Sequence, residues 1–276
     1  LGTAHAVDQA RESLAGFSGD AIVLYGDTPF IKPETIQNML LAKADGFDVV
    51  VLGFDAAIPG KYGRLIVKDG ALMRIVEAKD ATADELDVTL CNSGVICADS
   101  ELLFDLIAQV GNDNASGEYY LTDIVEIANN AGKRCVAVTC DEFEALGINS
   151  RPELAKAEAI FQTAARHDAM VNGATLQAAD SVYFSFDTKL GKDVVVEPNV
   201  VFGTGVTVKD NANIRAFSHL EDCVIRKGAT VGPYARIRPG SDIGEDAKVG
   251  NFVETKKALI AKGAKVNHLS YIGDAS

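Results

Sequence analysis

No run of apolar residues in the chain reaches the roughly 18 residues that a membrane-spanning helix needs, so we expect no membrane insertion. The sequence also lacks a basic excess: 26 Lys and Arg stand against 39 Asp and Glu, for a formal net charge of −13. This balance argues against nucleic acid as a partner, because phosphate backbones require a basic surface. It leaves room for a local phosphate pocket, which needs only a few cations. With 276 residues, the chain is long enough for two domains, each with its own core.

The sequence has no C-x-x-C pair, and its five cysteines make an odd number. Most of them lie in apolar, strand-like runs, and the four histidines do not accompany them at a spacing typical of zinc sites. We therefore expect buried, reduced thiols in the cytoplasm. The cysteines are Cys91, Cys97, Cys135, Cys140 and Cys223.

A secretory signal peptide and an initiator methionine are also lacking. The chain begins at Leu1 and ends at Ser276, inside a repeating pattern. We therefore expect it to be an internal piece of a longer cytoplasmic protein.

Residues 1–149 alternate strand-like and helix-like segments. The apolar run Ala21–Tyr25 ends at Gly26-Asp27, and Pro33 opens a helix that runs to about Ala44. Asp69-Gly70 is a strong hairpin signal. Further strands are predicted at Asp48–Phe54, Tyr62–Val67, Leu72–Val76, Val95–Ala98 and Arg134–Cys140, and further helices at Ser100–Val110, with Ser100 as its N-cap, and at Tyr119–Asn130. This alternation predicts an α/β domain with a mostly parallel sheet covered on both faces.

Residues 151–167 read as a single helix that connects two domains. Pro152 falls in its first turn, where proline is harmless, and Ala, Glu, Lys and Gln dominate the rest. We expect a connecting helix and linker over residues 150–180.

From about Leu190 an aliphatic or aromatic residue recurs every six positions. The period predicts a parallel β-helix in which each hexad forms one flat face and three hexads form one coil. Runs of six, five and three hexads, fourteen in all, predict between four and five coils. The recurring residues are Leu190, Val196, Phe202, Val208, Ile214 and Leu220, then Ile225, Val231, Ile237, Ile243 and Val249, then Ile260, Val266 and Ile272.

Several motifs resemble those of one family, the bacterial bifunctional GlmU enzymes, which join an N-acetylglucosamine-1-phosphate uridyltransferase to a glucosamine-1-phosphate acetyltransferase. The similarity covers nearly the whole chain, and the last motifs are highly specific. The motifs are L-G-T-x-H-A at Leu1–Ala6, Y-G-D-x-P at Tyr25–Pro29, Y-G-R at Tyr62–Arg64, I-V-E-x-K-D at Ile75–Asp80, N-S-G at Asn92–Gly94, N-x-x-G-E-Y-Y-x-T-D at Asn114–Asp123, G-I-N at Gly147–Asn149, G-P-Y-A-R-I-R-P-G at Gly232–Gly240, V-G-N-F-V-E-T-K-K at Val249–Lys257 and H-L-S-Y-I-G-D at His268–Asp274.

The resemblance implies a nucleotidyltransferase domain with a Rossmann-like mixed sheet over residues 1–149, followed by a left-handed parallel β-helix over residues 181–276 that transfers acetyl groups. It implies Mg²⁺ as cofactor, acetyl-CoA and UTP as co-substrates, and a homotrimer held by the β-helix. The product would be UDP-N-acetylglucosamine for the bacterial envelope. The family's glycine-rich nucleotide loop and its lysine should precede Leu1, and further acetyl-CoA contacts should follow Ser276. The chain by itself is therefore a candidate for an inactive piece of an active enzyme.

For uridyl transfer, the resemblance implies a substrate site made of Gly2, Thr3, Tyr25, Gly26, Asp27, Gly63, Glu77, Asn92 and Asn149, with Asp27 and Asn149 as the magnesium ligands. Independently of the resemblance, Asp27 follows the end of a buried strand, where open α/β sheets bind ligands. Three plainer interpretations stay open: Asp27 caps a turn, Gly63 is an ordinary turn residue, and Glu77 is a surface charge.

For acetyl transfer, Arg238 and Lys256 each follow an inward position and lie three hexads apart, which is one coil. Stacked cations repel unless an anion lies between them, and a sugar phosphate would supply one. Glu254 could balance the pair or bind the sugar, and the alternative is two solvated charges.

The resemblance assigns the general base to His268, with Tyr271 as a further substrate contact. Acetyl transfer needs a neutral amine, and histidine is suited to take its proton. The alternative for His268 is a structural imidazole.

Two other functions remain open at this point. One is a monofunctional sugar-phosphate nucleotidyltransferase whose β-helix only trimerises or regulates. The other is a noncatalytic scaffold.

Overall fold

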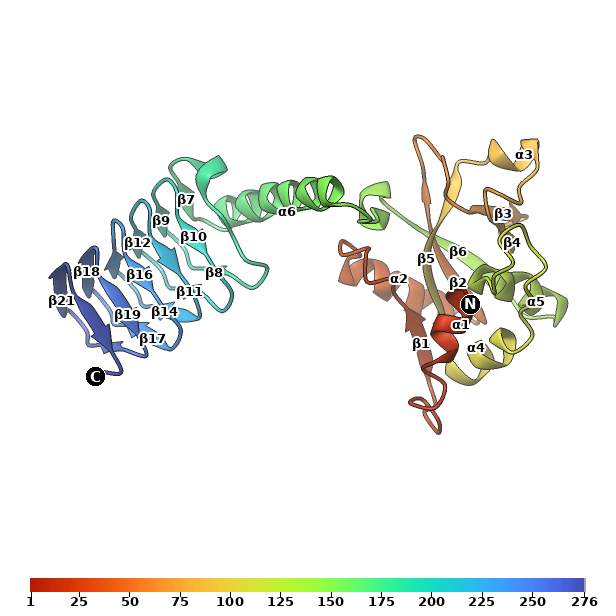
Figure 1. The fold of residues 1–276 in the computed structure, drawn as a ribbon, viewed down its shortest axis with the longest axis horizontal. Helices are drawn as coiled ribbons and strands as arrows, with labels where there is room; N and C mark the ends of the chain where they lie inside the picture. Colours follow the sequence, from red (N-terminus) through yellow and green to blue (C-terminus); the bar gives the residue numbers. More distant parts are fainter. Residues whose placement is uncertain (276) are drawn as a thin grey trace. The chain divides into compact units, whose positions relative to one another are not determined.

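The structure is a computed structural model that describes residues 1–275. The chain forms two compact units, residues 1–149 and a second unit from Ser150 onward (Figure 1). Among the described residues, no helix combines the length and the apolar character needed to cross a membrane.

The first unit is a six-stranded sheet with helices around it (Figure 1). Its helices are α1 (Thr3–Asp8), α2 (Pro33–Ala44), α3 (Ala83–Leu86), α4 (Ser100–Ile107) and α5 (Ile124–Asn130), with 3-10 helices η1 (Leu121–Asp123) and η2 (Glu142–Ala145). Its strands are β1 (Asp20–Val23), β2 (Val49–Asp55), β3 (Arg64–Lys68), β4 (Ala71–Val76), β5 (Leu90–Asp99) and β6 (Cys135–Cys140).

The sheet is mixed, as the resemblance implies, but the expectation of a mostly parallel sheet is wrong. The strand order is β4-β3-β5-β2-β6, with β1 paired to β5, and among these pairs only β2 and β6 are parallel. The reason is that β5 lies between β1 and β2 and runs antiparallel to both. The alternation of strands and helices along the chain predicts that β1, α2 and β2 form a crossover unit. It does not show which strand lies between β1 and β2 in the sheet.

Helices cover both faces of the sheet, as predicted. Alternate residues of β2 point to opposite faces, because side chains alternate along a strand. Val49 and Val51 belong to the core that includes Leu103 of α4 and Ile124 of α5, whereas Val50 packs with residues of α2 on the other face.

The helix boundaries differ from the prediction at four places. Helix α4 ends at Ile107, three residues before the predicted end at Val110. Asp99, not Ser100, caps α4: its carboxylate accepts hydrogen bonds from the backbone N–H groups of Glu101 and Leu102 at 3.0 and 3.2 Å. Tyr119–Asn130 is not one helix, since η1 precedes α5 there. The predicted connecting helix extends further, as α6 (Arg151–Val171).

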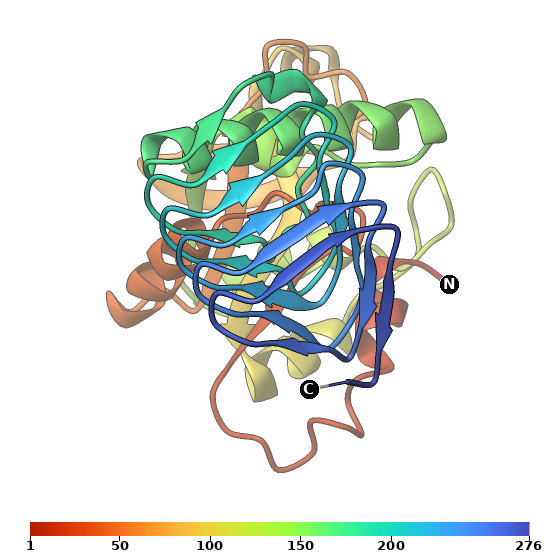
Figure 2. The same cartoon turned by 90° about the vertical axis from the view of Figure 1, so that its left-hand side faces the viewer.

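The second unit is a parallel β-solenoid that begins beside α6, and its coils are visible end-on in Figure 2. The arrangement is that of the hexapeptide-type left-handed β-helix. Its three sheets are β10 (Val201–Phe202), β13 (His219–Leu220), β16 (Arg236–Ile237), β19 (Glu254–Lys256) and β22 (Tyr271–Gly273); β8 (Lys189–Leu190), β11 (Thr207–Val208), β14 (Cys223–Ile225), β17 (Ser241–Ile243) and β20 (Leu259–Ile260); and β7 (Thr175–Leu176), β9 (Val195–Val196), β12 (Asn213–Ile214), β15 (Thr230–Val231), β18 (Lys248–Asn251) and β21 (Lys265–His268).

The predicted inward residues from Val196 to Val249 are all buried, so the hexad pattern identified the core of the solenoid. The solenoid nevertheless begins earlier than Leu190. Leu176 pairs with Val196, and the 3-10 helix η3 (Ala179–Ser181) occupies part of this first coil. The step from Leu176 to Val196 is longer than three hexads, and the extra residues hide the period in the sequence.

Four cysteines are buried, Cys140 is partly buried, and all five are free thiols. Burial raises the pKa of the Cys97 thiol to about 11 and that of Cys135 to about 12. These thiols therefore stay protonated and pack as small apolar groups.

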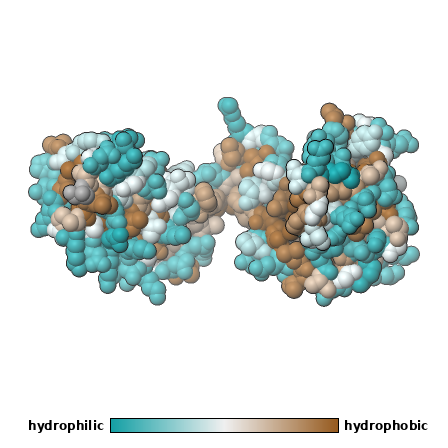
Figure 3. Space-filling view, turned by 90° about the horizontal axis from the view of Figure 1, so that it is seen from below, coloured by the Kyte–Doolittle hydropathy of each residue, from teal (hydrophilic) through white to brown (hydrophobic). Residues whose placement is uncertain are grey.

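Figure 3 shows hydrophobic residues gathered over part of one face of the first unit. The exposed hydrophobic residues of this unit include Leu24, next to Tyr25, and Leu40 and Leu41 of α2. Leu24, which precedes the predicted nucleotide contact Tyr25 in the sequence, is thus an apolar side chain exposed to solvent.

Candidate functional site

The predicted magnesium ligands lie near each other beyond the end of β1. The backbone N–H of Ile148 donates to the carbonyl of Asp27 at 2.9 Å, which fastens the end of the first unit to the loop after β1. A Cβ on Gly147 would lie 3.5 Å from the Asn149 amide nitrogen and 3.9 Å from a carboxylate oxygen of Asp27. The Asp27 and Asn149 side chains therefore converge on the same small space.

This donor set fits Mg²⁺. Magnesium prefers hard oxygen ligands and usually keeps waters and substrate phosphates beside one or two carboxylates. Among the described residues, no group of three or more His, Cys, Asp or Glu side chains is arranged to hold a metal ion. A metal at Asp27 and Asn149 would thus need phosphate oxygens and water to complete its coordination.

Tyr25 lies in a narrow space between Gly94 and Thr3. A Cβ on Gly94 would lie only 2.3 Å from Cε2 of the Tyr25 ring, so only glycine allows the ring its position. The Tyr25 hydroxyl shares a hydrogen bond with Thr3, and the Thr3 Oγ1 accepts another from the backbone N–H of Leu121 at 2.9 Å. Burial, with the charges of Glu77 and Asp27, raises the pKa of Tyr25, which keeps it a neutral hydrogen-bond donor.

The three predicted sugar contacts form a second group close to Tyr25. A Cβ on Gly63 would lie 3.5 Å from both carboxylate oxygens of Glu77. The backbone N–H of Asn92 donates to the carbonyl of Gly63 at 2.8 Å, and its side-chain Oδ1 accepts from the N–H of Gly94 at 3.0 Å. Glu77 is therefore not a simple surface charge, because it lies half-buried beside Gly63 and Tyr25.

Two residues without a predicted role also belong to this group. The Thr122 hydroxyl donates to Glu77 at 3.3 Å. Burial, followed by the charges of Glu126, Glu77 and Asp80, raises the pKa of Asp123 to about 6. Both residues stand in the N-x-x-G-E-Y-Y-x-T-D motif, which is the signal that could have identified them.

The remaining predicted residues of this site are glycines. A Cβ on Gly2 would lie 2.5 Å from the carbonyl oxygen of Tyr119, so Gly2 allows α1 to start close to that backbone. A Cβ on Gly26 would meet no atom within 4 Å, so its position faces open space next to Asp27. The structure thus brings the nine predicted residues of the uridyl-transfer site to one region, and their roles stay predictions.

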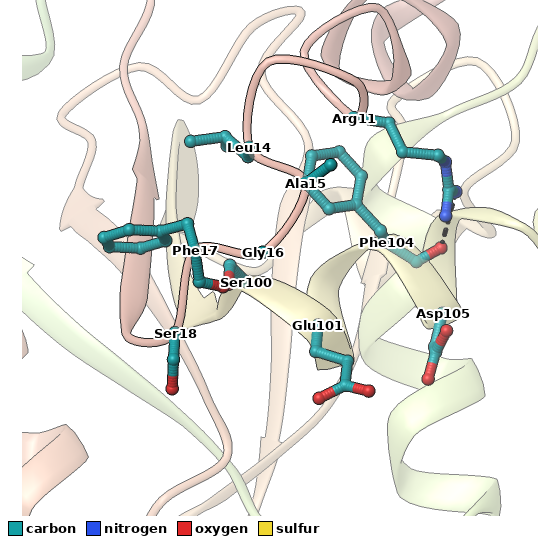
Figure 4. A pocket seen from close by; sticks show the side chains of 10 residues that line it. All are labelled: Arg11, Leu14, Ala15, Gly16, Phe17, Ser18, Ser100, Glu101, Phe104 and Asp105. Atoms are coloured by element: carbon teal, nitrogen blue, oxygen red, sulfur yellow. Dashed lines mark hydrogen bonds between the residues drawn. The ribbon is translucent and has the colours of Figure 1, made fainter.

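A pocket of about 420 Å³ lies elsewhere in the first unit, between the segment Arg11–Ser18 and the start of α4 (Figure 4). Figure 4 shows Arg11 reaching over the Phe104 ring, and its NH2 donates to the Phe104 carbonyl at 2.9 Å. None of the predicted site residues lines this pocket.

The second site lies on the outer face of the sheet that contains β16, β19 and β22. Ile237 pairs with Thr255, so Arg238 and Lys256 occupy the same position on neighbouring coils, as the spacing predicts. Arg238 forms an ion pair with Glu254, with 2.8 Å between NH1 and Oε1. Of the two alternatives for Glu254, the structure thus agrees with the first, in which its carboxylate balances the charge of Arg238. Among the described residues, Lys256 has no carboxylate within ion-pair distance.

Tyr271 joins this group, and His268 lies one corner away. Lys256 pairs with Gly273, and a Cβ on Gly273 would lie 2.5 Å from the Tyr271 hydroxyl. The phenol therefore reaches toward the Lys256 position. His268 pairs with Asn251 on the adjacent sheet. Leu269, with φ of 51°, forms the corner of the chain between His268 and Tyr271. His268 and Tyr271 are both exposed in the last coil of the described residues.

Residues 222–257 match the bacterial transferase hexapeptide family (six repeats). The second unit thus has the fold of a hexapeptide-repeat β-helix, joined to a mixed-sheet α/β unit.

The whole chain is similar to proteins that contain both parts. It is 60% identical over 276 residues to the bifunctional protein GlmU of Jannaschia sp. (strain CCS1), and 59% identical over 276 residues to that of Ruegeria sp. (strain TM1040). The resemblance found in the motifs is confirmed. The chain covers 61% of the length of each of these relatives.

A weaker similarity links the chain to a solved structure, the acetyltransferase domain of PglB from Neisseria gonorrhoeae FA1090 in complex with acetyl coenzyme A. The TM-score is 0.34 at 14% identity, over 51% of this chain and 68% of that one. A similarity at this level carries no inference about ligands.

Proposed function

We propose that the chain is the central part of a bifunctional enzyme that makes UDP-N-acetylglucosamine. The second unit would contribute to acetyl transfer from acetyl-CoA to glucosamine 1-phosphate. The first unit would contribute to uridyl transfer from UTP to the resulting N-acetylglucosamine 1-phosphate. The observation that carries this proposal is the convergence of Asp27, Asn149, Tyr25 and Glu77 in one unit, in a chain 60% identical to a GlmU protein over its whole length.

In uridyl transfer, a phosphate oxygen of the sugar phosphate forms a bond to the α-phosphorus of UTP, and the bond to pyrophosphate breaks. No protein nucleophile is needed, so the protein contributes by positioning its substrates. At the sugar, Glu77 would accept hydrogen bonds and Asn92 would donate them. Tyr25 would donate a hydrogen bond to the nucleotide. Asp27 and Asn149 would hold Mg²⁺, which when bound neutralises phosphate charge.

In acetyl transfer, the amine of glucosamine 1-phosphate forms a bond to the acetyl carbon, and the bond between that carbon and sulfur breaks. His268 would take the amine proton, and the proton would then reach the departing thiolate. Arg238 and Lys256 would bind the sugar phosphate, with Tyr271 beside them. A stalk used only for trimerisation would not need this group of residues.

We also propose that the second unit forms a homotrimer in the cytoplasm. An aromatic ladder, defined as Phe217, Tyr234 and Phe252, occupies one corner of three successive coils, with ring centroids 4.9 and 5.2 Å apart. Each ring is about half exposed, so contact with another subunit would remove apolar surface from water. Light scattering after size-exclusion chromatography should give three times the chain mass, and a Phe252→Ser variant should shift toward monomer. A monomeric parent chain would contradict this part of the proposal.

The central test uses a longer protein, in which this chain is joined at both ends to the corresponding segments of the Jannaschia GlmU. A His268→Ala variant should lose acetyl transfer by at least about a hundredfold and keep uridyl transfer, because general-base catalysis typically contributes this much or more. The matched control is His219→Ala, which removes an exposed histidine from the same solenoid. If the longer protein transfers uridyl but never acetyl groups, the acetyl-transfer part of the proposal is wrong.

A further inference from the structure

Arg64 is a buried cation without an acidic partner. It begins β3 and is 2% exposed, and among the described residues no carboxylate lies within ion-pair distance of it. Its guanidinium donates instead to backbone carbonyls of Tyr62, Gly60 at 3.2 Å and Leu86 at 3.4 Å. Its Nε is buried without any hydrogen-bond partner. Removing such a charge from water costs free energy that carbonyl dipoles offset only partly, so stability alone does not account for this arginine.

The strand register places Arg64 directly behind the sugar-contact group. Arg64 pairs with Val76 of β4 on one side and with Cys91 of β5 on the other. Both neighbouring strands run antiparallel to β3. Gly63, which precedes Arg64, therefore lies in one row with Glu77 and Asn92, which follow the two partners.

The carbonyls that accept hydrogen bonds from Arg64 belong to segments that position Gly63 relative to Glu77 and Asn92. Gly60 and Tyr62 belong to the segment that enters β3 through Gly63, and Leu86 ends α3. A planar guanidinium holds several acceptors in a fixed geometry, which a flexible ammonium group does not. Because a Cβ on Gly63 would lie only 3.5 Å from both Glu77 oxygens, a small shift of this segment changes the space in front of Glu77.

We propose that Arg64 is a positioning residue for the sugar end of the uridyl-transfer site: by holding the Gly60–Tyr62 segment through its carbonyls, it sets the distance between Gly63 and Glu77, and thereby the fit of the N-acetylglucosamine moiety. This inference rests on the proposed function only for the identity of the sugar phosphate.

The test is an Arg64→Met variant of the longer protein described above. Its KM for N-acetylglucosamine 1-phosphate should rise about tenfold or more, because a loss of about 1.4 kcal/mol of binding free energy at the misplaced sugar contacts weakens affinity tenfold. Its KM for UTP should stay within about twofold, since the nucleotide contacts lie on other segments. The unfolding temperature should be unchanged or higher, because the variant removes a buried, unpaired charge. Arg64→Lys keeps the charge but not the planar fork, and it should raise the same KM.

The matched control is Arg74→Met, on the same hairpin, where Arg74 forms an ion pair with Glu85 at partial exposure. This control should leave both KM values unchanged. An Arg64→Met protein with an unchanged sugar-phosphate KM would overturn the proposal. So would a lower unfolding temperature with both KM values raised together, since that result indicates a general structural role.

Calorimetric binding of N-acetylglucosamine 1-phosphate separates this proposal from the proposed function. If the parent protein binds the sugar phosphate but transfers no uridyl group, the proposed function fails. The Arg64 proposal is then decided by whether Arg64→Met weakens that binding by about tenfold, as expected for a misplaced contact group.

Discussion

Replacing Gly94 with alanine tests whether Tyr25 is held by close packing. Gly94 has φ of +88°, a left-handed conformation that costs an alanine about 1–2 kcal/mol. The new Cβ would lie 2.3 Å from Cε2 of Tyr25, whereas ordinary contact begins at 3.4 Å. The ring would have to move by about 1 Å, and such overpacking adds about 1–3 kcal/mol. We therefore expect Gly94→Ala to lower the unfolding free energy of the first unit by about 2–5 kcal/mol.

The matched control is Gly70→Ala, in the turn between β3 and β4. Gly70 has φ of +82°, almost the same backbone conformation, but a Cβ there would meet no atom within 4 Å. It should cost only the backbone strain of about 1–2 kcal/mol. The difference between the two variants therefore measures the contact with Tyr25.

Native-state hydrogen exchange of β5 amides measures the opening free energy of the first unit separately from the solenoid. In the longer protein, Gly94→Ala should also weaken nucleotide binding, because the displaced ring loses its hydrogen bond with Thr3. If the two glycine variants cost the same free energy and bind nucleotide equally well, the packing argument for Tyr25 is refuted.

Three further predictions concern charge and core packing. Because the folded-state pKa of Asp123 is raised to about 6, its folded form binds more protons than the unfolded chain between about pH 4 and 6, so stability falls as pH rises through that window. Asp123→Asn should therefore raise the unfolding free energy by about 1–2 kcal/mol above pH 6 and change it little at pH 4, after allowance for partial exposure; equal effects at both pH values would contradict this. Ile237→Ala should lower the opening free energy of the solenoid, measured by hydrogen exchange of its amides, by about 2–5 kcal/mol, because Ile237 is fully buried. A loss below about 1 kcal/mol would show that the coil collapses around the cavity. Glu254→Gln should cost less than about 1 kcal/mol by the same measurement, since the ion pair with Arg238 is partly exposed; a larger loss would mean that the pair supports the coil.

The solenoid could be predicted from the sequence because its order is local and periodic. Inward residues lie six positions apart, except for the five-residue step from Leu220 to Ile225, and every coil repeats the same burial. The pattern from Val196 to Val249 therefore shows directly which residues form the core. The prediction missed the first coil, where the step from Leu176 to Val196 exceeds three hexads and breaks the period.

The direction of the strands in the first unit could not be predicted in the same way. Apolar runs identify β1, β2 and β5 as strands, but they do not show that β5 lies antiparallel between the other two. That choice depends on contacts between segments far apart in the chain. The capping residue of α4 is a smaller case: Asp99 and Ser100 are both suitable caps, and only the backbone geometry selects Asp99.

For the candidate sites, the sequence by itself determined the residue types and their motifs, and the coil spacing that aligns Arg238 with Lys256. Only the tertiary structure placed Asp27 beside Asn149, Tyr25 against Gly94, and Glu77 against Gly63 and Thr122. The physical reason is that in a solenoid the residues that touch on neighbouring coils are separated by a nearly fixed number of positions, so the repeat period predicts these contacts. A mixed sheet instead brings together residues from distant segments, such as Val49 and Cys135, and such contacts depend on how the whole core packs.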